Sequence, residues 1–167
     1  MKTIKDAAST FLTTKRIAVT GVSRDGVGHG ANTVYKRLRE RGYDVFAVNP
    51  NAETVEGDRA YDSLAEIPGG VDAVVVATRP EQAEATMQEC ADLGIKHVWM
   101  HRGPGGGSVC DAATVFGRAH GITVIDGGCP LMFAPTADGA HKVMRIILTI
   151  AGKVPRHVPE PKRCEQS

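Results

Sequence analysis

Short apolar runs alternate along the chain with stretches in which apolar residues recur every three or four positions. The runs are short and rich in β-branched residues, as buried strands are. They predict five strands, at residues 16–21, 44–49, 71–77, 95–100 and 122–126. The stretches between them have helical spacing, with proline at a start or glycine at an end. They predict an opening helix and four more, at residues 31–42, 80–94, 108–120 and 136–151, the last with Val143, Ile146, Ile147 and Ile150 on one face.

This alternation of strand and helix is typical of a parallel sheet covered on both faces. The exception is the connection at residues 60–70, AYDSLAEIPGG, which predicts a short or irregular helix. The expected fold class is therefore α/β: a doubly wound, mainly parallel, five-stranded Rossmann-like sheet with helices on both faces. Residues 1–152 form this domain, and residues 153–167, rich in proline and charge, are expected to be a flexible tail.

Composition and charge narrow the functional classes. The chain of 167 residues has 20 Lys+Arg and 19 Asp+Glu, a net charge of +1 that gives no general attraction to nucleic acid or an anionic membrane. It has neither an apolar run long enough for a membrane span nor the apolar block of a secretory signal, so we expect a cytoplasmic protein. The spacing of the four cysteines favours free thiols over a metal site: Cys90, Cys110, Cys129 and Cys164.

Glycine is abundant, at 19 residues, and many glycines follow the predicted strands. Ligands of open α/β sheets bind beyond the carboxyl ends of the strands. The first such loop, residues 21–30, reads GVSRDGVGHG, and its glycines allow close approach of a phosphate to the backbone and to the next helix. Ser23 and Arg24 add a hydroxyl and a guanidinium. The loop matches neither a P-loop nor G-x-G-x-x-G, although its G-x-G-x-G run leaves an NAD(P) site open.

Two further loops bear on the identity of a nucleotide. Asn49-Pro50 follows the second strand, where NAD sites usually carry an acidic residue for the ribose hydroxyls. Ala77-Thr78-Arg79-Pro80 follows the third strand and brings a cation to the same edge of the sheet. The arginine in the third of these loops suits a ligand with phosphates. The absence of an acidic residue after the second strand argues against NAD.

The last two loops hold candidate reactive groups. His101 opens a glycine-rich stretch over residues 101–108 and could donate a hydrogen bond to a ligand, but the sequence shows no partner that would orient it as a base. Cys129 lies in residues 126–130, DGGCP, where the thiol of a cysteine at a helix start can have a lowered pKa. Nothing in the sequence pairs Cys129 with a histidine, so the sequence does not establish nucleophilic catalysis by this thiol. Catalysis by Cys129 stays an open alternative.

The order of these motifs resembles a known family. The motifs are GVS at 21–23, VNPN at 48–51, RP at 79–80, VWM at 98–100 and GCP at 128–130. Together they resemble the small stand-alone CoA-binding domain proteins, which share a fold with the CoA-binding domain of the succinyl-CoA synthetase α subunit and related acyl-CoA synthetases. The resemblance covers about residues 10–150, and it rests on motif order, because no single motif is specific.

The resemblance implies coenzyme A as the ligand. It implies that the first loop and helix start hold the diphosphate, that Asn49 and Pro50 lie beside the adenosine, and that the third loop contacts the adenine or phosphates. The loop at His101 would flank the pantetheine, and Cys129-Pro130 would lie near the thiol. The site residues expected on this basis are Gly21, Val22, Ser23, Arg24, Gly30, Asn49, Pro50, Ala77, Thr78, Arg79, Pro80, His101, Cys129 and Pro130.

The chain also departs from the synthetases. Gly128 and Leu131 flank Cys129-Pro130 where the synthetases have N-C-P-G, and the sequence has no room for their phosphohistidine domain. We therefore expect a module that binds CoA or an acyl-CoA as a carrier, sensor or regulator, with no catalytic residue singled out and enzymatic activity left open. The alternatives are an NAD(P)-dependent oxidoreductase and a thiol-redox regulator that uses Cys129. A homo-oligomer or a protein partner is possible.

Overall fold

A computed structural model gives the structure of the protein. It describes residues 1–103 and 106–160. Residues 104–105 and 161–167 lie outside the described residues, and with them Cys164 and part of the glycine-rich stretch named above.

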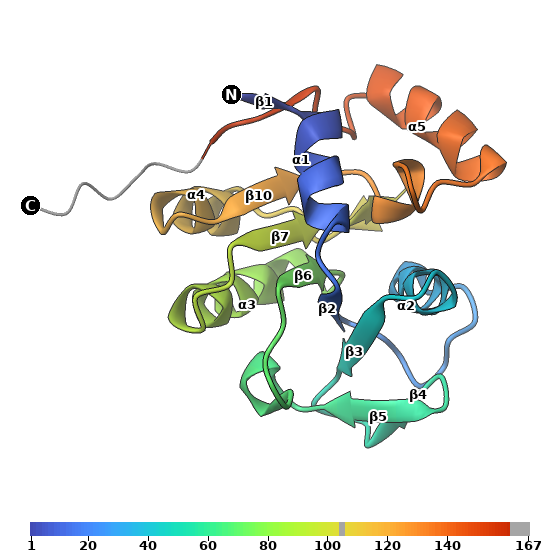
Figure 1. Ribbon diagram of the computed structural model, residues 1–167, viewed down its shortest axis with the longest axis vertical. Coiled ribbons are helices and arrows are strands. Elements are labelled where there is room, and N and C mark those ends of the chain that lie inside the picture. The colour runs from blue at the N-terminus through green and yellow to red at the C-terminus, as the bar shows by residue number, and fades with distance from the viewer. Residues whose placement is uncertain (104–105, 161–167) are drawn as a thin grey trace, which may run out of the picture.

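The five predicted strands are present and form the parallel centre of a sheet (Figure 1). The sheet has seven strands in the order β10-β7-β6-β2-β3-β5-β4. Neighbouring strands from β10 to β3 pair in parallel. The predicted strands are β2 (Arg16–Thr20), β3 (Asp44–Val48), β6 (Ala73–Val76), β7 (His97–Met100) and β10 (Thr123–Asp126). After β3 the chain crosses back and places β6 on the other side of β2, so the order of winding reverses between β2 and β6.

Two strands of this central sheet were not predicted, so the expectation of five strands was wrong at one edge. β5 (Asp58–Tyr61) pairs in parallel with β3, and β4 (Thr54–Val55) pairs with β5 in an antiparallel hairpin. The predicted irregular helix is the single turn η1 (Leu64–Glu66). β5 has the sequence DRAY with one fully buried position, Ala60, and so short a polar strand lacks the apolar pattern of the others.

The helices form two layers. α1 (Ile4–Leu12) and α2 (Gly30–Glu40) cover one face of the sheet, together with α5 (Gly139–Ile150), and α3 (Pro80–Asp92) and α4 (Asp111–Ala119) cover the other (Figure 1). Helices α2, α3 and α4 are each followed by a glycine with positive φ, which is the conformation that ends many helices: Gly42, Gly94 and Gly121. The expected doubly wound α/β fold is thereby confirmed.

A row of side chains crosses the sheet on the face of α1 and α2. Ile125, Trp99, Val75, Val19 and Ala47 are neighbours in register on five adjacent strands, and all are buried. The Trp99 ring centroid lies 5.3 Å from that of Phe11 and 5.5 Å from that of Phe133. The indole N–H of Trp99 also donates to the carbonyl of Gly127 at 2.9 Å, so the core directly fixes a loop at the carboxyl edge.

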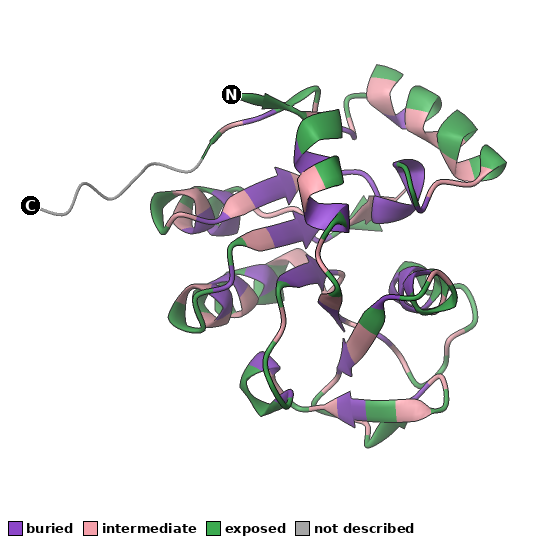
Figure 2. Ribbon diagram, in the orientation of Figure 1, coloured by how far each residue is buried: buried purple, intermediate pink, exposed green. Residues whose placement is uncertain are grey.

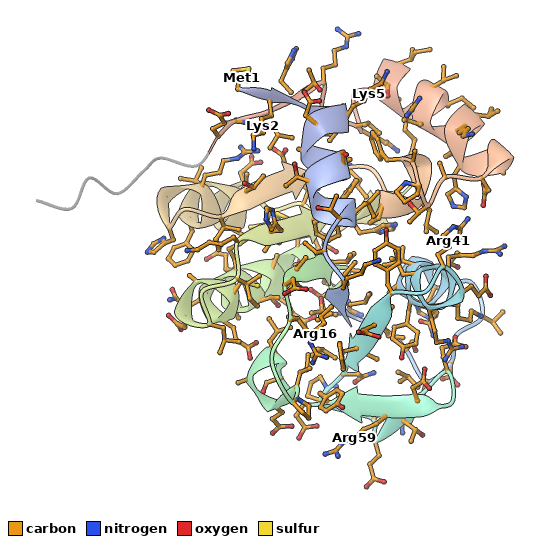
Figure 3. The ribbon with its side chains drawn as sticks, in the orientation of Figure 1. Met1, Lys2, Lys5, Arg16, Arg41 and Arg59 are labelled. Atoms are coloured by element: carbon orange, nitrogen blue, oxygen red, sulfur yellow. The ribbon has the colours of Figure 1, made fainter. Side chains whose placement is uncertain are left out.

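The amino edge of the sheet is closed by protein contacts. Arg16, labelled in Figure 3, begins β2, and its Nε donates to the carbonyl of Gly70 at 2.8 Å. Its guanidinium also lies 4.5 Å from the centre of the Phe46 ring. The carboxylate of Asp72 accepts a hydrogen bond from the Arg16 backbone N–H at 3.0 Å. Loops at this edge are thus tied to one another.

The C-terminal segment is ordered further than expected. β11 (His157–Val158) pairs with β1 (Lys2–Thr3) next to α1, and Val154 and Val158 are buried. The described part of the segment, to residue 160, thus packs against the domain, and the flexibility expected of residues 153–167 stays a prediction. β11, which includes the buried Val158, contacts α1 and β10, and the buried Val154 lies against Gly128.

Helix α5 contacts the body along a narrow line. Leu148 is its buried residue, whereas Val143, Ile146, Ile147 and Ile150 are between 55% and 81% exposed. Figure 2 shows the helix as mostly exposed or intermediate. The apolar face that the sequence predicts on α5 therefore points away from the core. Within the described residues, no helix combines the length and apolarity that a membrane span requires.

Candidate ligand-binding site

A pocket of about 620 Å³ lies at the carboxyl ends of the parallel strands. Its walls come from the loops after β2, β6, β7 and β10, from the starts of α2 and α3, and from η2 (Pro130–Met132) and α5. Its volume is within the range of small-molecule sites, roughly 300–1,000 Å³. It includes the point where the winding reverses between β2 and β6, which is where ligands of open α/β sheets bind.

The crevice between β2 and β6 depends on Gly21. This residue has φ +78°, and a Cβ on it would lie 2.5 Å from the carbonyl oxygen of Ala77. A side chain at this position would therefore force the two loops apart. Their close approach brings the start of α2 and the start of α3 to the same pocket, and the first N–H groups of a helix have no partner inside the helix.

The loop at residues 21–30 is held by an amide clamp. The Ser23 N–H donates to Asn32 Oδ1 at 2.9 Å, and Asn32 Nδ2 donates to the Ser23 carbonyl at 2.8 Å and to Glu56 Oε1 at 2.7 Å. Asn32 is fully buried. Asn49 Nδ2 donates to the Val22 carbonyl at 2.8 Å, so Asn49 also supports the loop. The loop is fixed before any ligand arrives.

Glu56 reaches this clamp from the turn between β4 and β5. The hydrogen bond from Asn32 lowers the pKa of the Glu56 carboxyl, and Lys36, 3.6 Å away, has the same effect. Glu56 has φ 50°, and its Oε1 would lie 2.3 Å from a Cβ on Gly26. An ionised carboxylate therefore lies against the middle of the glycine-rich loop. Sequence reasoning missed both Asn32 and Glu56, because neither lies in a motif.

One wall of the pocket is polar. Thr78, Arg79 and Pro80 lead from β6 into α3, with Pro80 at the first helical position and Arg79 exposed. The Thr78 hydroxyl is buried and has no hydrogen-bond partner among the described residues. The Ser108 hydroxyl donates to the Thr78 carbonyl and ties this wall to the loop after β7. A cation, an unpaired hydroxyl and a helix N-terminus together suit an anionic ligand.

His101 lies between this wall and α2. Its ring would be 3.1 Å from a Cβ on Gly30, so the imidazole packs on the first residue of α2. Burial lowers the pKa of His101 to about 4, which keeps the ring neutral at neutral pH. Its backbone is fixed on both sides, since its N–H donates to Val76 at 2.9 Å and its carbonyl accepts from Ser108 at 2.8 Å.

The opposite end of the pocket is apolar. Leu131 and Met132 from η2, Met144 from α5 and Cys129 line it. Burial raises the pKa of the Cys129 thiol to about 12, so the thiol stays protonated at neutral pH. The possibility of a lowered pKa at Cys129 is therefore contradicted: the cysteine precedes only a 3-10 turn, and its sulfur is in the core.

The start of α5 closes the pocket at this end. Asp138 precedes the helix and accepts at Oδ1 from the His141 N–H and from His141 Nδ1, both at 2.8 Å. These bonds lower the pKa of Asp138. His141 lines the pocket, and its pairing with Asp138 is an N-terminal cap that fixes α5 beside η2.

Eight of the fourteen residues predicted for the site line the pocket. They are Gly21, Gly30, Ala77, Thr78, Arg79, Pro80, His101 and Cys129. The other six lie outside its lining: Val22, Ser23, Arg24, Asn49, Pro50 and Pro130. Sequence reasoning missed the contribution of α5 and most of η2, because the chain reaches them after the last strand, where the rule about strand ends gives no signal.

Comparison with known protein families gives one match over most of the chain. The model of the CoA binding domain family matches residues 15–135. Among curated proteins, the chain is 38% identical over 89 residues to the α subunit of an ADP-forming acetate–CoA ligase II from Pyrococcus furiosus, which covers 53% of this chain and 19% of that protein. It is 35% identical over 89 residues to the uncharacterized protein YneT from Bacillus subtilis, covering 53% of this chain and 65% of that one. The match thus spans less than two thirds of either relative.

Solved structures give the same fold. A hypothetical protein from Pyrococcus horikoshii superposes with a TM-score of 0.71 at 25% identity and covers 87% of this chain and 97% of that chain. A redesigned binding variant of the protein PH1109 gives a TM-score of 0.69 at 27% identity, covering 91% and 94%. The architecture described above is therefore that of small proteins of similar length.

Proposed function

Because the chain belongs to the CoA binding domain family, we propose that it binds coenzyme A in the pocket at the carboxyl edge of the sheet. The observation that carries this proposal is the polar wall of Thr78, Arg79 and the α3 N-terminus. A ligand with phosphates supplies an acceptor for the unpaired Thr78 hydroxyl and a charge-assisted bond for Arg79. The pantetheine arm then follows the pocket toward η2 and α5.

We propose that the protein binds without catalysing a reaction, as a carrier, sensor or regulatory module. Two observations support this. The His101 ring has no hydrogen-bond partner among the described residues, and its lowered pKa makes it a weak base. The Cys129 thiol is protonated and buried, which removes the nucleophile that a thiol-redox mechanism needs.

Calorimetric titration tests the proposal directly. The protein is titrated with CoA and, separately, with NAD⁺ and NADP⁺, and we expect saturable heat with CoA alone. Arg79→Ala should weaken CoA binding by about 1.5–3 kcal/mol, or roughly 10- to 150-fold, if Arg79 makes a charge-assisted hydrogen bond. Arg59→Ala is the matched control, because Arg59 lies on β5 over the Tyr61 ring, away from the pocket (Figure 3).

The outcomes separate the candidates. Binding of a dinucleotide without CoA binding would reject the proposal in favour of an oxidoreductase cofactor. Equal CoA affinities for Arg79→Ala and the wild type would remove the polar wall from the site.

A further inference from the structure

We propose that the apolar end of the pocket, under η2 and α5, holds the acyl group of an acyl-CoA, and that this acyl group is apolar and uncharged. The inference rests on the proposed CoA binding and adds the class of thioester that the site selects. Four side chains define this acyl end: Cys129, Leu131, Met132 and Met144.

The pocket joins two sides of the molecule with different chemistry. Thr78, Arg79 and Ser108 lie on the side of α3 and α4. The acyl end lies on the side of α2, because η2, which carries Leu131 and Met132, packs against both α2 and α5. Arg79, the one arginine or lysine among the described lining residues, is thus separated from the four apolar side chains, although His29, Thr33 and His141 also line the side of α2 and α5.

This separation sets the direction of a bound thioester. CoA carries its phosphates at the nucleotide end and its sulfur at the other end. Phosphates require cations, hydroxyls or free N–H groups, which the α3 side supplies at Arg79, Thr78 and the helix start. The sulfur and its acyl group are then directed to the side of η2 and α5.

The acyl end can receive an apolar group and adapt to its shape. Leu131 and Met132 are almost fully buried, and the protonated Cys129 thiol behaves as a small apolar group. Met144 is half-buried and packs against the core from α5. A methionine there can change rotamer around acyl groups of different length, because its side chain is unbranched.

The charges around the acyl end disfavour a carboxylated acyl group. Asp138 acts electrostatically on the Cys129 thiol and is held by His141 at the start of α5; its pKa is lowered, so it carries a negative charge at neutral pH. Arg145 lies beside η2 but is not among the lining residues: its guanidinium lies 5.4 Å from the centre of the Phe133 ring, and its Nη1 donates to the Met132 carbonyl at 3.5 Å. Among the described lining residues, no lysine or arginine reaches this end. A buried carboxylate would be left without a counter-charge.

A series of thioesters tests the inference by calorimetry. CoA, acetyl-CoA and butyryl-CoA vary the length of the acyl group, and we expect affinity to rise about four-fold per buried methylene, hence roughly fifteen-fold from acetyl to butyryl. 4-Methylpentanoyl-CoA and succinyl-CoA have acyl groups with the same number of heavy atoms and similar shape. We expect the 4-methylpentanoyl thioester to bind at least ten-fold more tightly than the succinyl thioester.

Two lysine variants of α5 test whether the acyl group binds at the acyl end. Met144→Lys brings a cation to the acyl end and should reverse the preference toward succinyl-CoA. Ile146→Lys places the same charge on the exposed face of the same helix and should leave the ratio of the two affinities as in the wild type. Circular dichroism first confirms that each variant is folded. The ratio of the affinities for the two thioesters is then compared between the variants and the wild type.

The outcomes distinguish a failure of the acyl-end inference from a failure of the proposed CoA binding. If CoA binds but its affinity does not change with acyl length, or succinyl-CoA binds as tightly as its isostere, the acyl-end inference is wrong and CoA binding stands. If neither CoA nor any thioester binds, the proposed function fails and the inference fails with it. A Met144→Lys ratio equal to that of the wild type would also overturn the inference, because the acyl group would then lie elsewhere.

Discussion

Acid should destabilise this protein through His101. Burial holds the pKa of the folded ring at about 4, against 6.5 for an unperturbed histidine. As the pH falls below 6.5 the unfolded chain takes up a proton that the folded chain refuses, so the free energy of unfolding decreases. Across the whole window the loss amounts to about 3 kcal/mol. By about pH 7.5 the unfolded histidine is almost wholly neutral, and the contribution is then complete and constant.

Urea unfolding of the wild type and of His101→Gln measures this contribution. Glutamine is close in size and does not titrate, so the difference in unfolding free energy between the two proteins isolates the histidine. Other groups with shifted pKa values, such as His97, act equally in both and cancel. Relative to its value at pH 7.5, the difference should fall by roughly 1 kcal/mol at pH 5.5 and by roughly 2–3 kcal/mol at pH 4.5. A difference that is constant with pH would refute the burial and neutrality of the His101 ring.

Three further predictions follow from single contacts. Gly26→Ala should destabilise the fold by about 1–3 kcal/mol in the same urea assay, because its Cβ would collide with the Glu56 carboxylate; an unchanged midpoint would contradict the clamp. In the native protein at pH 8, mass spectrometry after alkylation should find Cys110 modified and Cys129 intact until urea is added; rapid native labelling of Cys129 would contradict its burial. Gly139→Ala should raise the unfolding free energy by about 0.4–1 kcal/mol, because its Cβ meets open space and its φ is ordinary; a lower midpoint would contradict this.

The central strands and helices were predictable because the residues of each element show by their own pattern whether the element is buried. Strands such as β6, with four consecutive buried valine or alanine positions, carry their burial in the sequence itself. β5, between β3 and the edge strand β4, does not, because it is four residues long and only Ala60 in it is buried. The ordered segment around β11 was missed for a related reason: two buried valines, Val154 and Val158, decide its position, and composition averages them away.

The candidate site was predictable where the chain itself places it. Gly21, Thr78 and His101 follow parallel strands, and the carboxyl ends of such strands meet at one edge of the sheet. Of the four residues of the acyl end, only Cys129 was predicted, because the place of Met144 depends on how α5 folds back over the sheet after the last strand. Met144 and its neighbour Val143 are both apolar and adjacent in sequence, yet one lines the pocket and the other is exposed.

The G-x-G-x-G run that favoured a dinucleotide has other causes in the structure. Gly26 is required by the Glu56 carboxylate, Gly30 lets the His101 ring pack on α2, and Gly28 has φ +79° in open space. A dinucleotide fingerprint instead needs its glycines to bring a pyrophosphate against the backbone. The ionised Glu56 carboxylate beside Gly26 would repel such a group at this point of the loop. The phosphates of a bound CoA are therefore expected on the Arg79 side of the pocket, which is the orientation that leaves the acyl end for the thioester.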